Sequence, residues 1–407
     1  MNRALIYLFP ALIDLVVATL QFVSSARAPK LGADAIGTGA VLMIWSLFYL
    51  STCYLLGKRV TVENAPRLLQ ISCFILTGLS ATFLTTSSLA VIYLLMAGTG
   101  IATAFFFVPF QIFMKAVDED DARALTFTTA CYTLAWSTGY ALAPLVAGYL
   151  MMLGPPSPSG EALGWKYCDL FSCAICLGTA AGLRLVKGRS LSPPKTQMPG
   201  KTELIPYEKM PNYAWLAWTM GGVGILAYSA LRSIFQEYAY QLSLSDALKG
   251  TILFVLSMTQ ALVGFSFLHS RLWMYRWRPL FALGLCGLAG MACFGWGKGP
   301  AAFLLGAGLY GTYSGGLFFY FTFHALTHAA VRSRHVAMNE IVFGSTALMG
   351  PLLGGFLADH ISPSFPYLCF GFLLLPCLIF QAVIHFRDRA RVDSVARIGQ
   401  VAPHGCN

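Results

Sequence analysis

Charged residues are scarce in this sequence. Asp, Glu, Lys and Arg together make up 11% of its 407 residues, whereas about 25% is usual for a soluble domain. Hydrophobic residues account for 57%, which is more apolar surface than the core of a soluble protein can take in. No domain-sized stretch has a soluble composition, so we expect the chain to reside in a lipid bilayer.

The motifs of common enzymes and nucleotide-binding sites are missing too. The sequence contains no HExxH, no GxSxG, no GxxxxGK[ST] and no GxGxxG that follows a strand. We therefore expect no enzyme activity, no cofactor and no ATP-driven pumping by this chain alone. The net charge of +10 is not gathered in a basic face or a recognition motif, so no nucleic-acid partner is expected.

Metal-binding patterns are weak. Most of the eleven cysteines lie within apolar runs, where cysteine behaves as a small hydrophobic residue. Cys173 and Cys176 have CxxC spacing but no His or acidic companion. His324 and His328 lie one helical turn apart without a third ligand. No metal site is predicted.

Long apolar runs are what the sequence has in abundance. About 20 apolar residues cross a bilayer as a helix, and lipid offers no partner for unpaired backbone groups. The first run is longer than the hydrophobic region of a usual signal peptide and contains Asp14, so we expect a membrane helix that is not cleaved. The sequence predicts an all-α membrane protein with twelve transmembrane helices, approximately at 4–25, 36–57, 67–85, 88–113, 124–152, 167–186, 213–240, 249–268, 279–297, 301–325, 337–359 and 365–386.

The basic residues are distributed unevenly between the connections. If both termini are cytoplasmic, most of the 27 Lys and Arg residues fall on the cytoplasmic side, as the positive-inside rule requires. The longest connection, 187–212, is rich in Pro, Lys and Ser and is predicted to be a cytoplasmic linker. It separates a six-helix bundle at 1–186 from another at 213–386, and a basic cytoplasmic tail follows at 387–407. The expected location is the plasma membrane, which is the inner membrane in a bacterium.

A phrase of proline and small residues occurs twice, about half a chain apart. Residues 143–150 read A-P-L-V-A-G-Y-L and residues 350–357 read G-P-L-L-G-G-F-L. A second pair, Leu31–Gly37 and Leu244–Gly250, precedes the second and eighth runs. Two like halves around a linker are typical of secondary transporters. Because proline removes a helical hydrogen bond and glycine lets a neighbouring helix come close, we predict conformational hinges at Gly139, Pro144, Gly148, Gly350, Pro351, Gly354 and Gly355.

These features resemble the major facilitator superfamily (MFS). Residues 350–355 match the family's GPxxGG phrase in the eleventh helix, and 139–148 is a softened version of its fifth-helix phrase. The resemblance covers all twelve runs and implies two pseudo-symmetric six-helix bundles and solute transport. The family's loop phrase GxLaDRxGRrxxL is degenerate here, because 57–69 keeps Gly57, Arg67 and the leucines but neither the aspartate nor the first arginine.

Ionisable residues at membrane depth cost about 2.5–3.5 kcal/mol or more, and they are the first candidates for a site. Asp14, near the middle of the first run, is expected either to carry a proton or contact solute in a central cavity, or to be a packing residue. Arg232 can hold an anionic group with Gln236 one turn away, and Glu237 can titrate. The alternative is a ring of charge at the outer water boundary.

Other polar and aromatic residues are candidates for the cavity or for a gate. Those expected at the cavity are Gln21, Trp136, Tyr228, Gln260, Tyr310 and Tyr313, although aromatic residues at helical spacing also serve for packing. Asn339 and Glu340 begin the eleventh run at its cytoplasmic end. Glu340 is expected to pair with Arg123, Arg332 or Arg334 as a cytoplasmic gate, or to be an acid that complements the helix dipole.

The predicted function is secondary active transport of a small organic solute by alternating access, with proton coupling as a further hypothesis. The expected partners are the solute, the lipid bilayer and, in that hypothesis, protons, and a monomer is expected. The alternative is a membrane sensor or assembly subunit that keeps the fold without transporting, a hypothesis that the degenerate loop phrase motivates.

Overall fold

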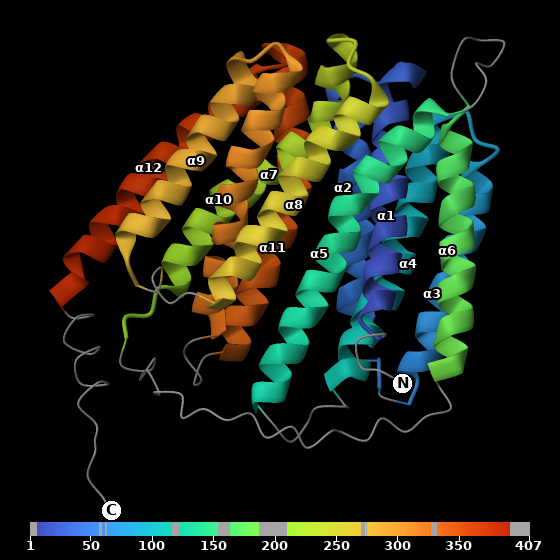
Figure 1. Cartoon of the computed structure of the whole chain (residues 1–407), viewed down its shortest axis with the longest axis horizontal. Helices are drawn as coiled ribbons and strands as arrows, with labels where there is room; N and C mark the ends of the chain where they lie inside the picture. The colour runs from blue at the N-terminus through green and yellow to red at the C-terminus, as the bar shows by residue number, and fades with distance from the viewer. Residues whose placement is uncertain are drawn as a thin grey trace, which may run out of the picture.

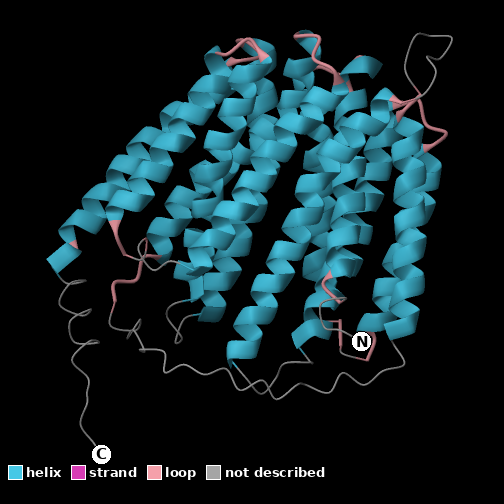
Figure 2. Ribbon diagram, viewed as in Figure 1, coloured by secondary structure: helices cyan, strands magenta, loops and turns pink. Residues whose placement is uncertain are grey.

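The described part of the chain contains twelve long helices. The structure, a computed structural model, describes residues 6–56, 59–61, 63–115, 122–153, 163–186, 210–269, 273, 275–326 and 332–390. Within these residues there is no strand (Figure 2). The helices are α1 (Leu8–Arg27), α2 (Ala35–Leu56), α3 (Ala65–Phe83), α4 (Leu89–Lys115), α5 (Ala122–Met152), α6 (Trp165–Val186), α7 (Ala214–Gln241), α8 (Asp246–His269), α9 (Trp277–Trp296), α10 (Pro300–Leu326), α11 (Arg332–His360) and α12 (Phe365–Arg387).

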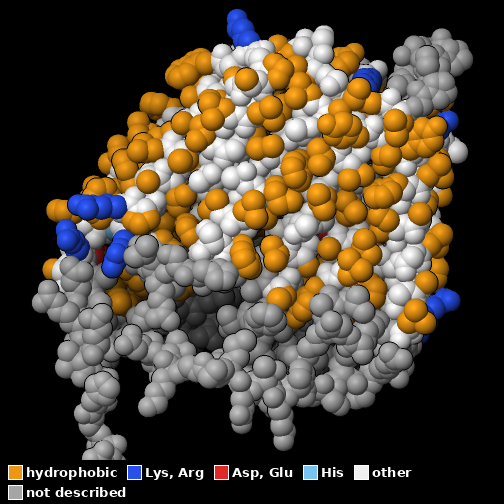
Figure 3. All heavy atoms as spheres, in the orientation of Figure 1, with side chains coloured by type: hydrophobic (Ala, Val, Ile, Leu, Met, Phe, Trp, Pro, Cys, Tyr) orange, Lys and Arg blue, Asp and Glu red, His pale blue; other side chains and the backbone are white. Residues whose placement is uncertain are grey.

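The helices are suited to a bilayer. Over the described residues, nine of them have the length and hydropathy to cross a membrane; they are α1, α2, α4, α6, α7, α8, α9, α11 and α12. Large apolar side chains face outward, for example Tyr54, Leu94 and Phe372. Figure 3 shows hydrophobic side chains over most of the visible face, with Lys and Arg near its margins. Such a surface would be a liability in water and is expected in lipid.

The helices form two six-helix bundles, α1–α6 and α7–α12 (Figure 1). The two bundles repeat the same packing pattern. In the first, α1 packs on α5 and α6, α3 on α4 and α6, and α2 on α4. In the second, α7 packs on α11 and α12, α9 on α10 and α12, and α8 on α10. Between the bundles, α5 packs on α8 and α11 packs on α2. Each of these contacts thus has its counterpart six helices later, which confirms the predicted pseudo-symmetry.

The repeated phrases Leu31–Gly37 and Leu244–Gly250 cap equivalent helices. Asp34 Oδ1 accepts a hydrogen bond of 2.7 Å from the backbone N–H of Gly37 in the first turn of α2. Ser245 Oγ accepts one of 3.3 Å from the N–H of Leu248 in the first turn of α8. Both are N-caps, which satisfy donors that have no partner inside the helix. The phrases therefore fix where the second helix of each bundle begins.

The proline-glycine phrases bring the bundles into backbone contact at one end of the molecule. We call this the distal end; it is where α1 is followed by α2 and α7 by α8, and the opposite end is the terminal end. A β-carbon added to Gly148 in α5 would lie 2.5 Å from the carbonyl oxygen of Asp246 in α8. One added to Gly355 in α11 would lie 2.7 Å from Cα of Ile36 in α2. Only glycine permits such approaches, so the two phrases make equivalent seals.

The predicted elements agree with the structure to within a few residues at most helix ends. The largest shift is where α11 begins, at Arg332, a few residues earlier than the apolar run indicates. Hydropathy marks the lipid-embedded stretch, and the helices continue beyond it into more polar sequence. Most of the predicted linker at 187–212 and of the tail at 387–407 lies outside the described residues.

Candidate functional site

A cavity of about 330 Å³ lies between the bundles. Four helices of each bundle contribute to its wall, namely α1, α2, α4 and α5 and their counterparts α7, α8, α10 and α11. The wall is mostly aromatic and aliphatic, with a few polar groups. The residues that line it are Asp14, Gln21, Leu42, Trp45, Ser46, Tyr49, Leu50, Thr103, Phe107, Gln111, Tyr132, Trp136, Tyr140, Ile225, Tyr228, Ser229, Arg232, Gln260, Phe318, Phe343, Gly344, Ala347 and Pro351.

Arg232 on α7 is the one Lys, Arg or His among the described residues of this wall. Its Nη1 donates hydrogen bonds to the hydroxyl oxygens of Ser257, at 2.8 Å, and of Tyr228, at 3.2 Å. Its Cζ lies 3.9 Å from the centre of the ring of Tyr140, which belongs to the other bundle. All three partners are neutral, so the guanidinium is held in place without its charge being neutralised by direct contact.

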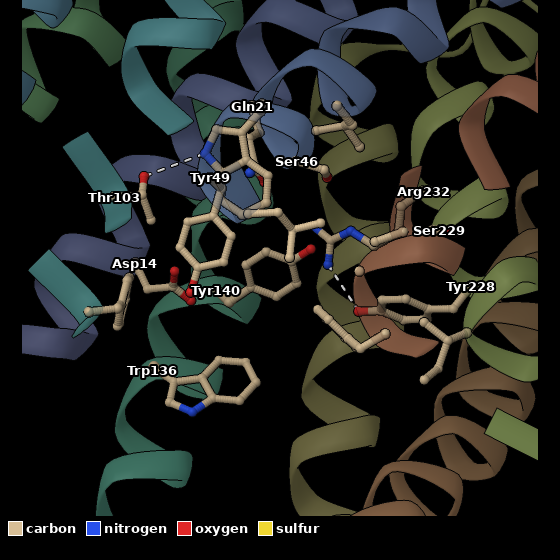
Figure 4. A pocket seen from close by; sticks show the side chains of 18 of the residues that line it. Asp14, Gln21, Ser46, Tyr49, Thr103, Trp136, Tyr140, Tyr228, Ser229 and Arg232 are labelled. Carbon is tan, nitrogen blue, oxygen red and sulfur yellow. Dashed lines mark hydrogen bonds between the residues drawn. The ribbon is translucent and has the colours of Figure 1, made fainter. Parts of the chain in front are cut away.

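Asp14 faces the same cavity from α1 and is 8% exposed. No hydrogen bond or ion pair within 4.0 Å joins it to Arg232, but the two charges act on each other across the cavity. Figure 4 shows Tyr140 between the carboxylate of Asp14 and the guanidinium, with Trp136 close by. The cavity therefore holds one acid and one base, on opposite bundles, separated by an aromatic ring.

An aromatic surface on α2 completes the first bundle's side. Trp45 and Tyr49 lie one turn apart and stack, with ring centres 5.1 Å apart and planes within 5°. The indole N–H of Trp45 donates to Thr103 Oγ1 on α4 at 3.4 Å. These contacts hold two flat apolar surfaces at the cavity wall (Figure 4).

Six of the residues predicted for the cavity lie at its wall, and four do not. The six are Asp14, Gln21, Trp136, Tyr228, Arg232 and Gln260. Tyr310 and Tyr313 instead lie inside the second bundle. The hydroxyl of Tyr310 donates to the carbonyl oxygen of Gly224 at 2.8 Å, and the ring of Tyr313 packs over Gly287. Glycines on α7 and α9 make room for both rings, which draws them away from the cavity.

Gln236 and Glu237 lie farther along α7 towards the distal end and are not at the cavity wall. Glu237 accepts a hydrogen bond from the side-chain amide of Gln241. Both atoms of the Gln236 amide are buried and make no hydrogen bond within the described residues. Their expected role at the solute site is therefore not supported by their position.

The predicted cytoplasmic gate is described only in part. The side chains of Arg123, Arg334 and Glu340 lie outside the described part of the structure. Asn339 bonds within the second bundle: its Oδ1 accepts from the indole N–H of Trp218 at 2.7 Å, and its Nδ2 donates to the carbonyl oxygen of Phe321 at 3.2 Å. Asn339 thus ties α11 to α7 and α10, and among the described residues it makes no hydrogen bond to the first bundle.

The predicted hinge residues lie at helix contacts. Gly139 faces the backbone of α1 at Ala11, and Gly350 faces α7, where a β-carbon would meet Ser229. Gly354 packs on Ala230 of α7. Whether these positions bend during a transport cycle stays a prediction.

Pro144 and Pro351 each leave one backbone carbonyl near the cavity without its helical hydrogen-bond partner. Because proline has no N–H, the carbonyl four residues earlier loses its helical partner. For Pro144 that residue is Tyr140, and for Pro351 it is Ala347. Both Tyr140 and Ala347 line the cavity.

The distal end contains polar contacts between the bundles that no sequence pattern indicates. The carboxylate of Asp359, at the end of α11, accepts hydrogen bonds of 2.9 Å from the backbone N–H groups of both Ala35 and Ile36, at the start of α2. Lys30 Nζ pairs with Asp246 Oδ2 at 2.8 Å. We call these two contacts, together with the glycine approaches described above, the distal seal.

Several cavity residues were missed as well. Tyr140 follows Trp136 by four residues, and Tyr49 follows Trp45 by four, so each pair shares one helix face. That spacing is the signal that could have found them. Nothing in the sequence says that this face looks into a cavity and not towards lipid, because both surroundings accept aromatic side chains.

The described helices, in two pseudo-symmetric bundles around a cavity with one acidic and one basic residue on opposite sides, define a membrane transporter of the two-bundle class. The sequence profile of the Major Facilitator Superfamily matches residues 4–331. The chain therefore belongs to this superfamily and is an MFS transporter. No curated protein sequence matches the chain.

Solved structures with the same fold include two other transporters. One is a bacterial homolog of the human lysosomal transporter Spinster in an inward-facing and occupied conformation, with a TM-score of 0.64, 14% identity and coverage of 97% of this chain and 96% of that chain. The other is the nucleoside transporter NupG, with a TM-score of 0.64, 13% identity and coverage of 95% and 99%. At this level of identity the similarity is one of fold.

Proposed function

We propose that the protein moves a small organic solute across the membrane by secondary active, alternating-access transport. This proposal rests on the cavity between the two bundles, which has Asp14 on one side and Arg232 on the other. At the distal end the bundles are held together by the seal that the proline-glycine phrases of both halves form. A site with alternating exposure requires a seal of this kind at one end whenever the other end is open.

The positive-inside pattern assigns the terminal end to the cytoplasm and the distal end to the outside. In this orientation the described conformation is closed towards the outside by the distal seal. The location that fits is a plasma membrane, the inner membrane in a bacterium.

Proton coupling is assigned to Asp14 in this proposal. A carboxyl group at the cavity wall, mostly buried and without an ion-pair partner among the described residues, can alternate between its charged and neutral forms as access changes. The charge of Arg232 across the cavity makes its protonation sensitive to whatever else binds there.

Reconstitution into liposomes tests the proposal. Liposomes with and without the protein are exposed to a mixture of metabolites under an imposed pH gradient, and their contents are analysed by mass spectrometry. We expect at least one solute to accumulate only with the protein. Absence of flux for every solute would favour the alternative of a non-transporting sensor or assembly subunit.

The variant Asp14→Asn tests the coupling. It should lose accumulation driven by the pH gradient but keep exchange of solute across the membrane. Gly222→Ala is a matched control, because a β-carbon at Gly222 meets no atom within 4 Å. If Asp14→Asn accumulates solute as the control does, Asp14 is not the coupling residue.

A further inference from the structure

The unused donors of Arg232 describe the group that it can bind. Among the described residues, Nη1 is the one nitrogen of this guanidinium that makes protein hydrogen bonds, which leaves Nε and Nη2 as donors at the cavity wall. These two N–H groups lie in one plane and on one edge of the guanidinium, an arrangement that matches the two oxygens of a carboxylate. Tyr228, Ser257 and Tyr140 fix the plane of the guanidinium, so the fork is preorganised.

The single cation of the cavity wall indicates a ligand with one negative charge. Among the described residues of the wall, no second cation accompanies Arg232. A phosphate ester, which carries nearly two negative charges at neutral pH, would leave one of them unpaired in a mostly apolar cavity, and burying an unpaired charge is costly. A carboxylate is balanced by the single guanidinium.

The walls on either side of Arg232 fit a flat apolar body. Trp45, Tyr49 and Trp136 belong to the first bundle, and Phe318 and Phe343 to the second. The volume of about 330 Å³ equals that of about 11 molecules of liquid water and is at the lower end of the range for small-molecule pockets. One or two rings with a short acidic side chain would fill it.

The acid on the opposite wall sets a condition for anion binding. While Asp14 is ionised, its charge opposes that of an anion entering the cavity. A proton on Asp14 removes the repulsion and leaves the field of Arg232 unopposed. By reciprocity, a bound anion must then favour the proton on Asp14 to the same extent.

Few other groups act on Asp14. The titratable or charged groups facing it from the packed helices are Arg232 on α7, Tyr140 on α5 and Tyr49 on α2. The described wall residues of α4 are uncharged, and α6 contributes none. Arg232 is the one charged group whose effect on Asp14 is marked.

We propose that the cavity binds a monocarboxylate with an aromatic body, its carboxylate on Arg232, and that a proton on Asp14 promotes this binding. This inference rests on the proposed function, since it names the solute class of that same site. Binding of the anion and the proton together would make the protein a proton-coupled carboxylate transporter.

Equilibrium binding to the purified protein, measured by calorimetry, tests the solute class separately from transport. Four probes share one ring and differ in charge: phenylacetate, its neutral amide phenylacetamide, the amine phenethylamine and the zwitterion phenylalanine. We expect phenylacetate to bind about tenfold or more tightly than the amide. Arg232→Ala should lose this preference, and Arg232→Lys should restore it only in part because lysine lacks the planar fork.

The pH dependence separates the role of Asp14 from a merely structural one. In the wild type, phenylacetate should bind about fivefold or more tightly as the pH is lowered, provided that the pH stays above about 5 so that the probe remains ionised. Asp14→Asn should bind at least as tightly as the wild type at low pH, with little pH dependence. Arg276→Ala, which removes an exposed cation before α9, is the matched control and should behave as the wild type.

Three results would overturn the inference. One is equal binding of phenylacetate and phenylacetamide. Another is preferred binding of phenylalanine or phenethylamine that Asp14→Asn abolishes, which would assign Asp14 to an ammonium group. The last is no binding of any probe by protein that still transports another solute in liposomes; in that case the proposed function stands and the solute class fails.

Discussion

Asp359 offers a direct test of the distal seal. Its two carboxylate oxygens accept one hydrogen bond each from the first two N–H groups of α2 in the other bundle, both at 2.9 Å. These N–H groups have no partner within their own helix, and the start of a helix favours negative charge. The substitution Asp359→Asn keeps one acceptor oxygen but removes the charge and the second acceptor.

The magnitude follows from these contacts. A hydrogen bond to a charged group contributes about 1.5–3 kcal/mol when well shielded, and a charge at a helix start contributes about 0.3–1 kcal/mol. Asp359 is exposed, so water replaces much of what is lost. We therefore expect the sealed state to lose about 1 kcal/mol relative to the open state, which changes the opening equilibrium about fivefold.

Amide hydrogen exchange in nanodiscs measures this equilibrium. Peptides that cover the start of α2 will exchange faster in Asp359→Asn simply because two hydrogen bonds are altered. The informative reporter is the start of α8 at Asp246–Gly250, which contacts α5 in the other half of the seal. If the seal opens as a unit, exchange there should also rise about fivefold.

Asp34→Asn is the matched control. Asp34 also binds an N–H at the start of α2, but that bond lies within its own bundle, and asparagine is an equally good N-cap. This variant should leave exchange at α8 unchanged. A rise confined to α2 in Asp359→Asn would refute the reasoning, because the two halves of the seal would then open independently.

Two further predictions concern packing. Gly250→Val places a branched side chain against the carbonyl of Pro144, so exchange at the start of α8 should rise and the thermal midpoint fall, whereas Gly222→Ala should change neither. Trp165→Leu removes the ring that lies 3.6 Å from Cζ of Arg27, a buried cation. The lost cation–π interaction, about 2 kcal/mol, should lower the thermal midpoint. A midpoint equal to that of the wild type would contradict this prediction.

The number of helices and their pairing into halves could be predicted because they depend on local composition. An apolar run of membrane length specifies a helix by itself, since its backbone can bond nowhere else. The repeat of Pro144 and Pro351 at equivalent places then indicates that the halves are alike. Neither inference requires knowing which residues touch.

The faces of the helices could not be predicted in the same way. In a soluble helix the polar face marks the solvent, but here lipid and the bundle core are both apolar. Tyr140 and Tyr310 are therefore alike in sequence, although one lines the cavity and the other lies inside a bundle. The difference is a contact inside the bundle: the carbonyl oxygen of Gly224 accepts a hydrogen bond from the hydroxyl of Tyr310.

Asp14 and Arg232 could be found because charge at membrane depth stands out against an apolar run. Asp359 could not, because an acid at a helix end is ordinary and its partners, Ala35 and Ile36, are backbone groups more than 300 residues away in the chain. Backbone donors have no signature in sequence. Contacts of this kind emerge only when the two halves are packed together.

The repeated proline-glycine phrase joins the cavity to the seal within single helices. On α5, the carbonyl freed by Pro144 belongs to Tyr140 at the cavity wall, and Gly148 lies at the seal, eight residues or about 12 Å farther along. Arg232 of the opposite bundle stacks on the ring of Tyr140. A solute that binds Arg232 therefore acts on a contact between the bundles, about two turns from the place where they meet. In the proposed mechanism, α5 would therefore link solute binding to the seal directly, without any longer path through the protein.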